Sequence, residues 1–153
     1  MRSGDVAGAL GRGLVAGVVG TAAMTVSSTI EMRLRDRNAS TAPADAAAKV
    51  LGVHPDGDEA TARFSNIVHW AYGTSWGAVR GVLGVVGFGG VTGSAVHFGA
   101  VWGNEQVMLP ALGVAPPLRE WGASEVAIDL FHHLVYVTAT GLAYAYLDRR
   151  STV

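Results

Sequence analysis

The chain contains no cysteine and few charged residues, and both scarcities restrict what it can be. Without cysteine there are no disulfides, no thiolate metal ligands and no cysteine nucleophile. Only 15% of the 153 residues are charged, and the net charge is −1. A chain with this charge cannot neutralise a row of phosphates, which argues against nucleic acid as a partner. No charged side chain occurs in the 24 residues from 81 to 104. A soluble helix of that length needs charged positions to keep one face in water.

Long uncharged stretches make up most of the remaining sequence. Residues 13–30 and 64–79 lack charged side chains, and residues 126–147 contain only Asp129. About 20 apolar residues are enough to cross the hydrocarbon core of a bilayer. The mean hydropathy of +0.32 is low for a membrane protein, because residues 31–63 are polar and the apolar stretches are rich in small residues. We therefore predict an all-α, polytopic membrane protein.

The pattern predicts four transmembrane helices in a single membrane domain of residues 1–153, with a polar loop at 31–63. The predicted spans are residues 6–30, 64–86, 91–112 and 125–147. The N-terminal run resembles a secretory signal, but it exceeds the usual 7–15 apolar residues, so we read it as a span. In an alternative arrangement with three spans, residues 81–104 form one helix. Within the polar loop, Pro43 and Gly52 delimit a short helix at the membrane surface.

Small residues recur at four-residue spacing in three of the predicted spans. Each series occupies one helix face, which lets a neighbouring helix approach closely, so we predict a four-helix bundle with glycine-rich packing. The faces serve contacts within the chain or contacts with a second copy. The glycines of these predicted packing faces are Gly13, Gly17, Gly73, Gly77, Gly81, Gly99 and Gly103.

Ionisable residues inside the predicted spans fall into two layers. Charge within a membrane is expensive, so each such residue requires a partner or a function. We expect a polar cluster towards the side of the long loop and a second layer towards the opposite side. The cluster candidates are His69, Glu105, Glu125, Asp129, His132 and His133, and the second layer contains Arg80 and His97.

The first interpretation of the polar cluster is that it organises the bundle or relays protons, since acid and histidine side chains do both in membrane proteins. A metal site is one alternative, because imidazole and carboxylate suit transition metals. Haem held by His97 and His132 is another, as in a subunit of an electron-transfer complex. A purely structural subunit of a larger membrane assembly is also consistent with the sequence. No enzyme motif, catalytic residue, metal ligand set or cofactor is predicted.

Residues 110–136 resemble a family of small bacterial inner-membrane proteins, the YagU-like proteins. The resemblance rests on a Pro-x-x-Gly-x-x-Pro-Pro stretch that starts at Pro110, on the two acids Glu125 and Asp129, and on the string His-Leu-Val-Tyr that starts at His133. Asp129 stands where the family has Glu, and Glu105 stands where it has His. The resemblance implies a helical, multi-pass protein of the bacterial plasma membrane that is associated with acid-stress tolerance.

The sequence also gives expectations for partners and orientation. The lipid bilayer is the first expected partner, and the small-residue faces favour a homo-oligomer or other membrane subunits. Six basic residues lie on the side of the long loop, whereas the side of the termini has Arg2, Arg149 and Arg150, with Arg12 nearby. Because basic residues are enriched on the cytoplasmic side of a membrane, this count favours a cytoplasmic long loop. The topology of the family that the chain resembles implies the opposite orientation.

Overall fold

The computed structural model describes residues 3–151, which form five α-helices, one 3-10 turn and no strand. Arg2 lies outside the described residues. The elements are α1 (Ser3–Arg35), α2 (Ala42–Leu51), α3 (Asp58–Val85), α4 (Gly90–Ala111), η1 (Leu118–Glu120) and α5 (Ala123–Ser151).

The all-α prediction is confirmed, and so is the separation of α3 from α4. Helix α3 ends at Val85, and the turn that follows contains Gly87 with φ 94°, a conformation that favours glycine. The alternative of a single helix over residues 81–104 is therefore wrong. The short helix of the polar loop is also present, with Pro43 in its first turn and Gly52 at φ 66° after its end. Helices α1, α3 and α5 extend past the predicted spans because charged turns at their ends remain helical, whereas α4 agrees with its predicted span to within one residue at each end.

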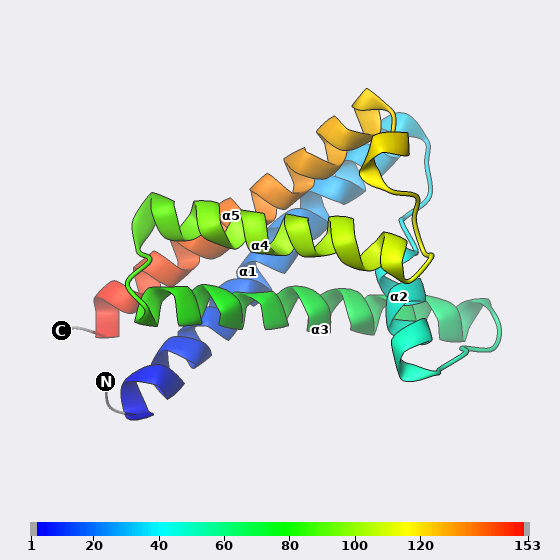
Figure 1. Cartoon of the computed structure of the whole chain (residues 1–153). Coiled ribbons are helices and arrows are strands. Elements are labelled where there is room, and N and C mark those ends of the chain that lie inside the picture. The colour runs from blue at the N-terminus through cyan, green and yellow to red at the C-terminus, as the bar shows by residue number, and fades with distance from the viewer. Residues whose placement is uncertain (1–2, 152–153) are drawn as a thin grey trace.

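Helices α1, α3, α4 and α5 form a bundle with two ends (Figure 1). Helix α1 packs against α3 and α5, and α4 packs against α5 and α3. Both termini and the turn between α3 and α4 lie at one end, here called the termini end (Figure 1). Helix α2 and the connection from α4 to α5 lie at the other, here called the loop end (Figure 1).

Glycine explains the close approach of α1 and α3. A Cβ atom on Gly17 would lie 2.6 Å from the carbonyl oxygen of Thr74, and one on Gly77 would lie 2.6 Å from the Cα of Gly17. Cβ atoms on Gly13 and Gly81 would likewise clash with backbone oxygens of the facing helix, and one on Gly73 would clash with the side chain of Thr21. These glycines therefore occupy a contact that larger residues would prevent.

The glycines of α4 differ. A Cβ atom on Gly99 or Gly103 would have nothing within 4 Å. The expectation that these two glycines pack inside the bundle is wrong for the described chain, because α4 contacts α3 and α5 through other faces. Whether they pack against a second copy stays a prediction.

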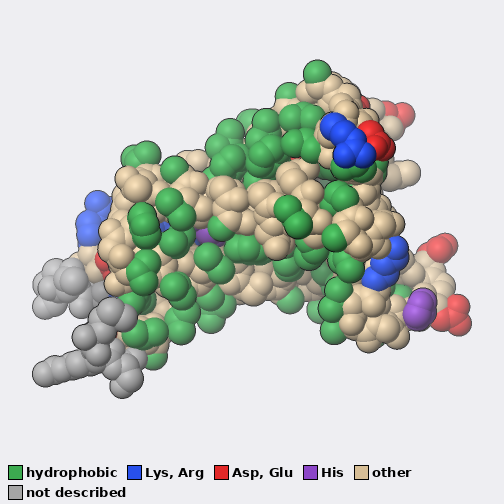
Figure 2. All heavy atoms as spheres, in the orientation of Figure 1, with side chains coloured by type: hydrophobic (Ala, Val, Ile, Leu, Met, Phe, Trp, Pro, Cys, Tyr) green, Lys and Arg blue, Asp and Glu red, His purple; other side chains and the backbone are tan. Residues whose placement is uncertain are grey.

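The bundle buries several polar side chains beside its apolar core and exposes many large apolar ones. The residues with the lowest exposure include Arg80 (1%), His97 (0%) and Thr140 (0%), whereas Val91 is 87% exposed and Leu142 is 69% exposed. On the face shown in Figure 2, charged side chains gather at the two ends and hydrophobic side chains cover much of the region between them. Such a distribution suits an apolar surrounding medium.

Among the described residues, two helices are long and apolar enough to cross a membrane, Gly4–Arg35 and Ala123–Arg150. Only 28% and 33% of their apolar windows are buried within the protein, unlike the core helix of a soluble domain. Helices α3 and α4 do not pass the same test of composition. Helix α3 contains Asp58, Glu59, Arg63 and Arg80, and α4 is rich in glycine and polar amides. All four predicted spans are thus helical, and two of these helices are also long and apolar enough to cross a membrane.

Candidate functional site: an acid–histidine cluster between two helices

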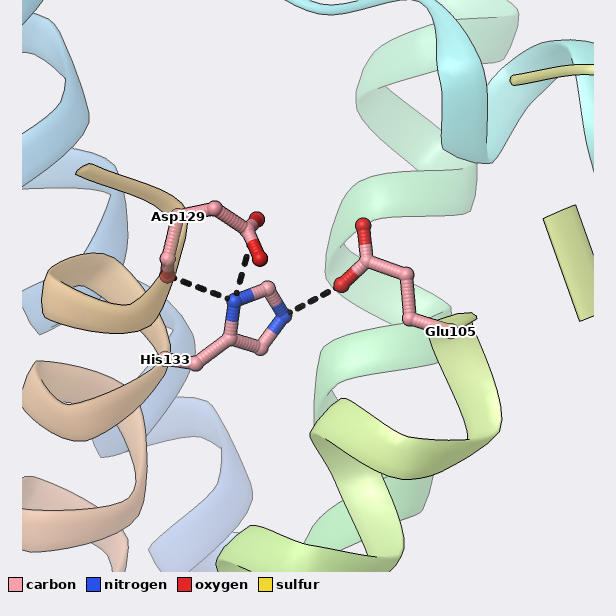
Figure 3. A group of neighbouring side chains, drawn as sticks. All are labelled: Glu105, Asp129 and His133. Carbon is pink, nitrogen blue, oxygen red and sulfur yellow. Dashed lines mark hydrogen bonds and ion pairs between the residues drawn. The ribbon is translucent and has the colours of Figure 1, made fainter. Parts of the chain in front are cut away.

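The imidazole of His133 lies between two carboxylates from different helices (Figure 3). Its Nε2 is 2.8 Å from a carboxylate oxygen of Glu105 on α4. Its Nδ1 is 3.4 Å from a carboxylate oxygen of Asp129 on α5 and hydrogen-bonds the carbonyl oxygen of the same residue at 2.9 Å. The indole N–H of Trp102 donates to the other carboxylate oxygen of Asp129 at 2.7 Å. We call Glu105, Asp129 and His133 the triad.

Helix geometry brings the triad together. Asp129 and His133 are four residues apart on α5, and Trp102 and Glu105 are three apart on α4, so each pair shares one face of its helix. The contact of α4 with α5 places these two faces opposite each other. His133 is 8% exposed, and both carboxylates are partly buried. The triad therefore links two helices at a position largely shielded from the surroundings.

The arrangement around His133 fits a doubly protonated ring. A neutral imidazole has one N–H donor and one acceptor nitrogen, whereas here both nitrogens face oxygen acceptors. An imidazolium between two carboxylates gives a unit with one negative charge, which can accept a further proton. One ligand atom from each residue also lies within 4.8 Å of the others, so the same side chains could hold a metal ion. A single ion would use only one of the two ring nitrogens.

His132 faces α1 instead of the triad. Its Nδ1 is 2.8 Å from the hydroxyl of Ser27, and its Nε2 is 3.8 Å from a carboxylate oxygen of Glu31. Arg37 forms an ion pair with Glu31, with its Nε 2.8 Å from the other carboxylate oxygen. Because Glu31 accepts these hydrogen bonds, its pKa is lowered and that of Arg37 is raised. His132 thus belongs to a second ionic group at the loop end.

Two further residues of the predicted cluster lie outside the triad. His69 contacts α1, with its Nε2 2.8 Å from the hydroxyl of Thr25. This position follows from the glycine face of α3, since His69 is one turn before Gly73 and shares the face that packs on α1. Glu125 is exposed at the start of α5, where it accepts a hydrogen bond from Ser124 at 3.2 Å. The prediction of one cluster of six residues is therefore wrong for His69, Glu125 and His132, and holds for Glu105, Asp129 and His133.

The second predicted layer is present near the termini end. The guanidinium of Arg80 lies 4.6 Å from the centre of the Tyr144 ring and donates to the carbonyl oxygen of Phe88 at 3.4 Å. His97 hydrogen-bonds the carbonyl oxygen of Trp76 through Nε2 at 2.9 Å. His97 and His132 have separate protein partners on different elements, which does not favour a haem held between them.

The sequence analysis did not identify Trp102 as part of the site or Arg12 as the partner of Asp148, at 3.0 Å. The signal for Trp102 was its three-residue spacing from Glu105. For Arg12 and Asp148 there was no local signal, because the two residues meet through the packing of α1 on α5.

Comparison with family models, with curated proteins and with solved structures finds no match to this chain.

Proposed function

We propose that this chain is a four-span membrane protein whose triad binds and releases protons within the bilayer. Helices α1, α3, α4 and α5 are the proposed spans. Each has at least 22 residues, and about 20 are enough to cross the hydrocarbon core. The buried Arg80 and His97 and the exposed apolar side chains support lipid as the surrounding medium. The resemblance of residues 110–136 to YagU-like proteins supports the bacterial plasma membrane as the location and acid stress as the context.

The observation that carries the proton-binding function is the position of the His133 ring. Carboxylates from two helices face its two nitrogens, so the triad has a site for a proton at each ring nitrogen and on each carboxylate. Ionisable residues inside membranes are expensive and commonly mark proton pathways. The same contacts hold α4 against α5, so a change in protonation alters how strongly the two helices associate. Proton binding and organisation of the bundle are therefore properties of one group of residues.

Infrared spectroscopy of the purified protein across a pH series tests the proton-binding function. The signals of protonated and ionised carboxyl groups separate in such spectra, so the titrating groups are directly visible. Replacement by the matching amide, Glu105→Gln or Asp129→Asn, keeps the shape of the side chain and removes the titrating oxygen. We expect each change to remove part of the carboxyl signal and to shift the rest, because the groups of the triad interact.

The matched control is Glu125→Gln, which changes an exposed carboxylate at the start of the same helix as Asp129. It removes one exposed carboxyl group and leaves the three residues of the triad unchanged. If Glu105→Gln and Asp129→Asn give the same change as Glu125→Gln, the triad does not bind protons as a unit and its role is structural.

The absence of cysteine makes the topology equally testable. Single cysteines at Ser40, Arg119 and Phe88 place one thiol in each connection between the proposed spans, and each position is exposed. The four-span arrangement predicts that a membrane-impermeant thiol reagent labels the first two from one side of the membrane and the third from the other. Labelling of all three from the same side would contradict it, and the side on which Ser40 is labelled gives the orientation.

A metal ion at the triad is the second candidate, favoured by the short distances among its three possible ligand atoms. Elemental analysis of the protein purified without chelators, followed by calorimetric titration with Zn²⁺ or Mn²⁺, tests this candidate. Binding that is lost in Glu105→Gln and retained in Glu125→Gln would favour the metal over the proton.

A further inference from the structure

Helix α5 presents one polar face to the interior of the bundle over most of its length. The residues of this face, here called the polar seam, succeed each other at three- and four-residue steps, so they share one side of the helix. All of them are buried or partly buried. The polar seam consists of Asp129, His133, Tyr136, Thr140, Tyr144 and Asp148.

The polar seam connects the triad with the termini end. Beyond His133, the hydroxyl of Tyr136 donates to the carbonyl oxygen of Gly73 at 2.6 Å. Thr140 follows one turn later with no exposed surface, and both side chains lie against Gly20. Tyr144 then reaches the guanidinium of Arg80. Polar side chains thus extend from the triad to Arg80 through the interior of the bundle.

Arg80 lies where the polar seam meets the beginning of α4. A Cβ atom on Gly93, in the first turn of α4, would be 3.1 Å from the central carbon of the guanidinium. Helix α4 has neither an acidic residue in its first turn nor a side-chain cap on Gly89. The N-terminus of a helix carries a positive partial charge, so the cation and the helix dipole add at this point.

Neighbouring charges reduce the positive potential at the termini end without cancelling it. Asp148 is the acidic side chain of the seam near Arg80, and it also forms an ion pair with Arg12 at 3.0 Å. At this end of the described chain, Arg12, Arg80, Arg149 and Arg150 contribute four positive charges against the two negative charges of Asp5 and Asp148. His97 faces the same region from α4 and adds no negative charge.

We propose that Arg80 and the N-terminus of α4 form an electrostatic barrier that closes the termini end of the polar seam to protons and cations. The proposal rests on the proposed four-span, proton-binding function. A fixed arginine or the positive end of a helix excludes protons from other membrane pores by the same physics. With this end closed, the triad exchanges protons with the loop end, where Glu31 and His132 lie. The protein then binds protons from one side of the membrane and does not conduct them across it.

Proton leakage into proteoliposomes that contain an internal pH dye tests the barrier. The wild-type protein should leak little under an imposed pH gradient and membrane potential. Arg80→Gln removes the charge, and we expect it to raise the leak by at least about tenfold, whereas Arg80→Lys keeps the charge and the low leak. Arg150→Gln is the control, since it removes an exposed arginine at the same end.

Two further variants separate loss of the barrier from loss of folding. Thr92→Glu puts a carboxylate on an exposed position in the first turn of α4, where an acidic residue stabilises the helix, and it should raise the leak relative to Thr92→Gln. In the double variant Arg80→Gln with Glu105→Gln, the leak should return towards the wild-type rate if protons pass through the triad. The barrier is refuted by an unchanged leak in both Arg80→Gln and Thr92→Glu, or by a leak that persists in the double variant. Failure of the proton-binding function itself would appear in the infrared titration, which does not depend on leakage.

Discussion

The same substitution, glycine to alanine, should have opposite effects at Gly77 of α3 and Gly99 of α4. Both glycines belong to series with four-residue spacing in helix interiors. A Cβ atom on Gly77 would lie 2.6 Å from the Cα of Gly17, whereas one on Gly99 would have nothing within 4 Å. The substitution therefore changes helix propensity equally at the two sites, and only at Gly77 does it introduce a clash with a neighbouring helix.

The structure sets the sign and size of each effect. Carbon atoms pack best at about 3.5–4.0 Å, so Gly77→Ala requires α1 and α3 to separate by about 1 Å along their contact. Overpacking of this kind destabilises a protein by about 1–3 kcal/mol. Alanine is favoured over glycine by about 1 kcal/mol in a helix interior, so Gly99→Ala should be neutral or stabilising by up to that amount. The helix preference applies at both sites and cancels, so the difference between the two variants should be the overpacking cost alone, about 1–3 kcal/mol.

Unfolding in mixed detergent micelles, followed by tryptophan fluorescence, measures this difference as a change in the free energy of unfolding. A destabilised Gly77→Ala beside an unaffected Gly99→Ala would agree with the packing of α1 on α3. Equal effects at the two sites would refute the reasoning. Destabilisation by Gly99→Ala that depends on protein concentration would instead show that the glycine face of α4 contacts a second copy.

Two further predictions concern single hydrogen-bonded groups. Trp102→Phe keeps an aromatic ring beside Phe98 but removes the N–H that donates to Asp129, so the free energy of unfolding should fall by about 1.5–3 kcal/mol in the same assay. The pKa of Glu31 is lowered below its ordinary value of 4.5 by hydrogen bonds from Arg37, so the stabilisation by Glu31 is complete above pH 4.5 and is lost as the pH falls through the lower folded-state pKa. Glu31→Gln should therefore reduce the difference in stability between neutral and strongly acidic pH, and an unchanged difference would contradict this account.

The helices were predictable because their signals are local. The uncharged runs gave the positions of α1, α3, α4 and α5, and the glycines at 87–90 separated α3 from α4. Pro43 and Gly52 delimited the short helix of the loop. The ends of the long helices were less predictable, because the apolar runs stop where the lipid is expected to stop, while the charged turns beyond them remain helical.

The site was predictable only in part, because contacts between helices depend on rotation about each helix axis. The spacing of Asp129 and His133 showed that they share a face of α5, but not that Glu105 faces them. For His69, the glycine series of α3 already indicated which face of that helix packs against its neighbour. A residue one turn before Gly73 must face the helix that packs on the glycines, so its contact with Thr25 of α1 could have been inferred.

The burial of polar side chains also explains why only α1 and α5, among the described helices, are apolar enough on average to cross a membrane. Such an average measures the whole circumference of a helix, whereas in the proposed four-span bundle lipid would contact only the outer face. Arg80 of α3 and His97 of α4 lower the average although both are buried. Among the described residues, the exposed faces are the better guide to the surrounding medium. Between their charged ends they are mainly apolar on α1, α4 and α5, whereas that of α3 also carries Asn66 and Ser75.

A charge on one of these faces distinguishes lipid from water as the surrounding medium. Leu134 is 50% exposed near the middle of α5, and Val50 is 68% exposed on α2, outside the proposed spans. In lipid, Leu134→Arg should impair membrane insertion at a cost of about 2.5–3.5 kcal/mol, whereas Val50→Arg should have little effect. In water, both substitutions would fall within about 0.5 kcal/mol of the wild type, because exposed positions tolerate charge. The fraction of each variant that resists extraction from membranes by alkali measures insertion. Equal fractions for the two variants would show that the outer face of α5 does not contact lipid.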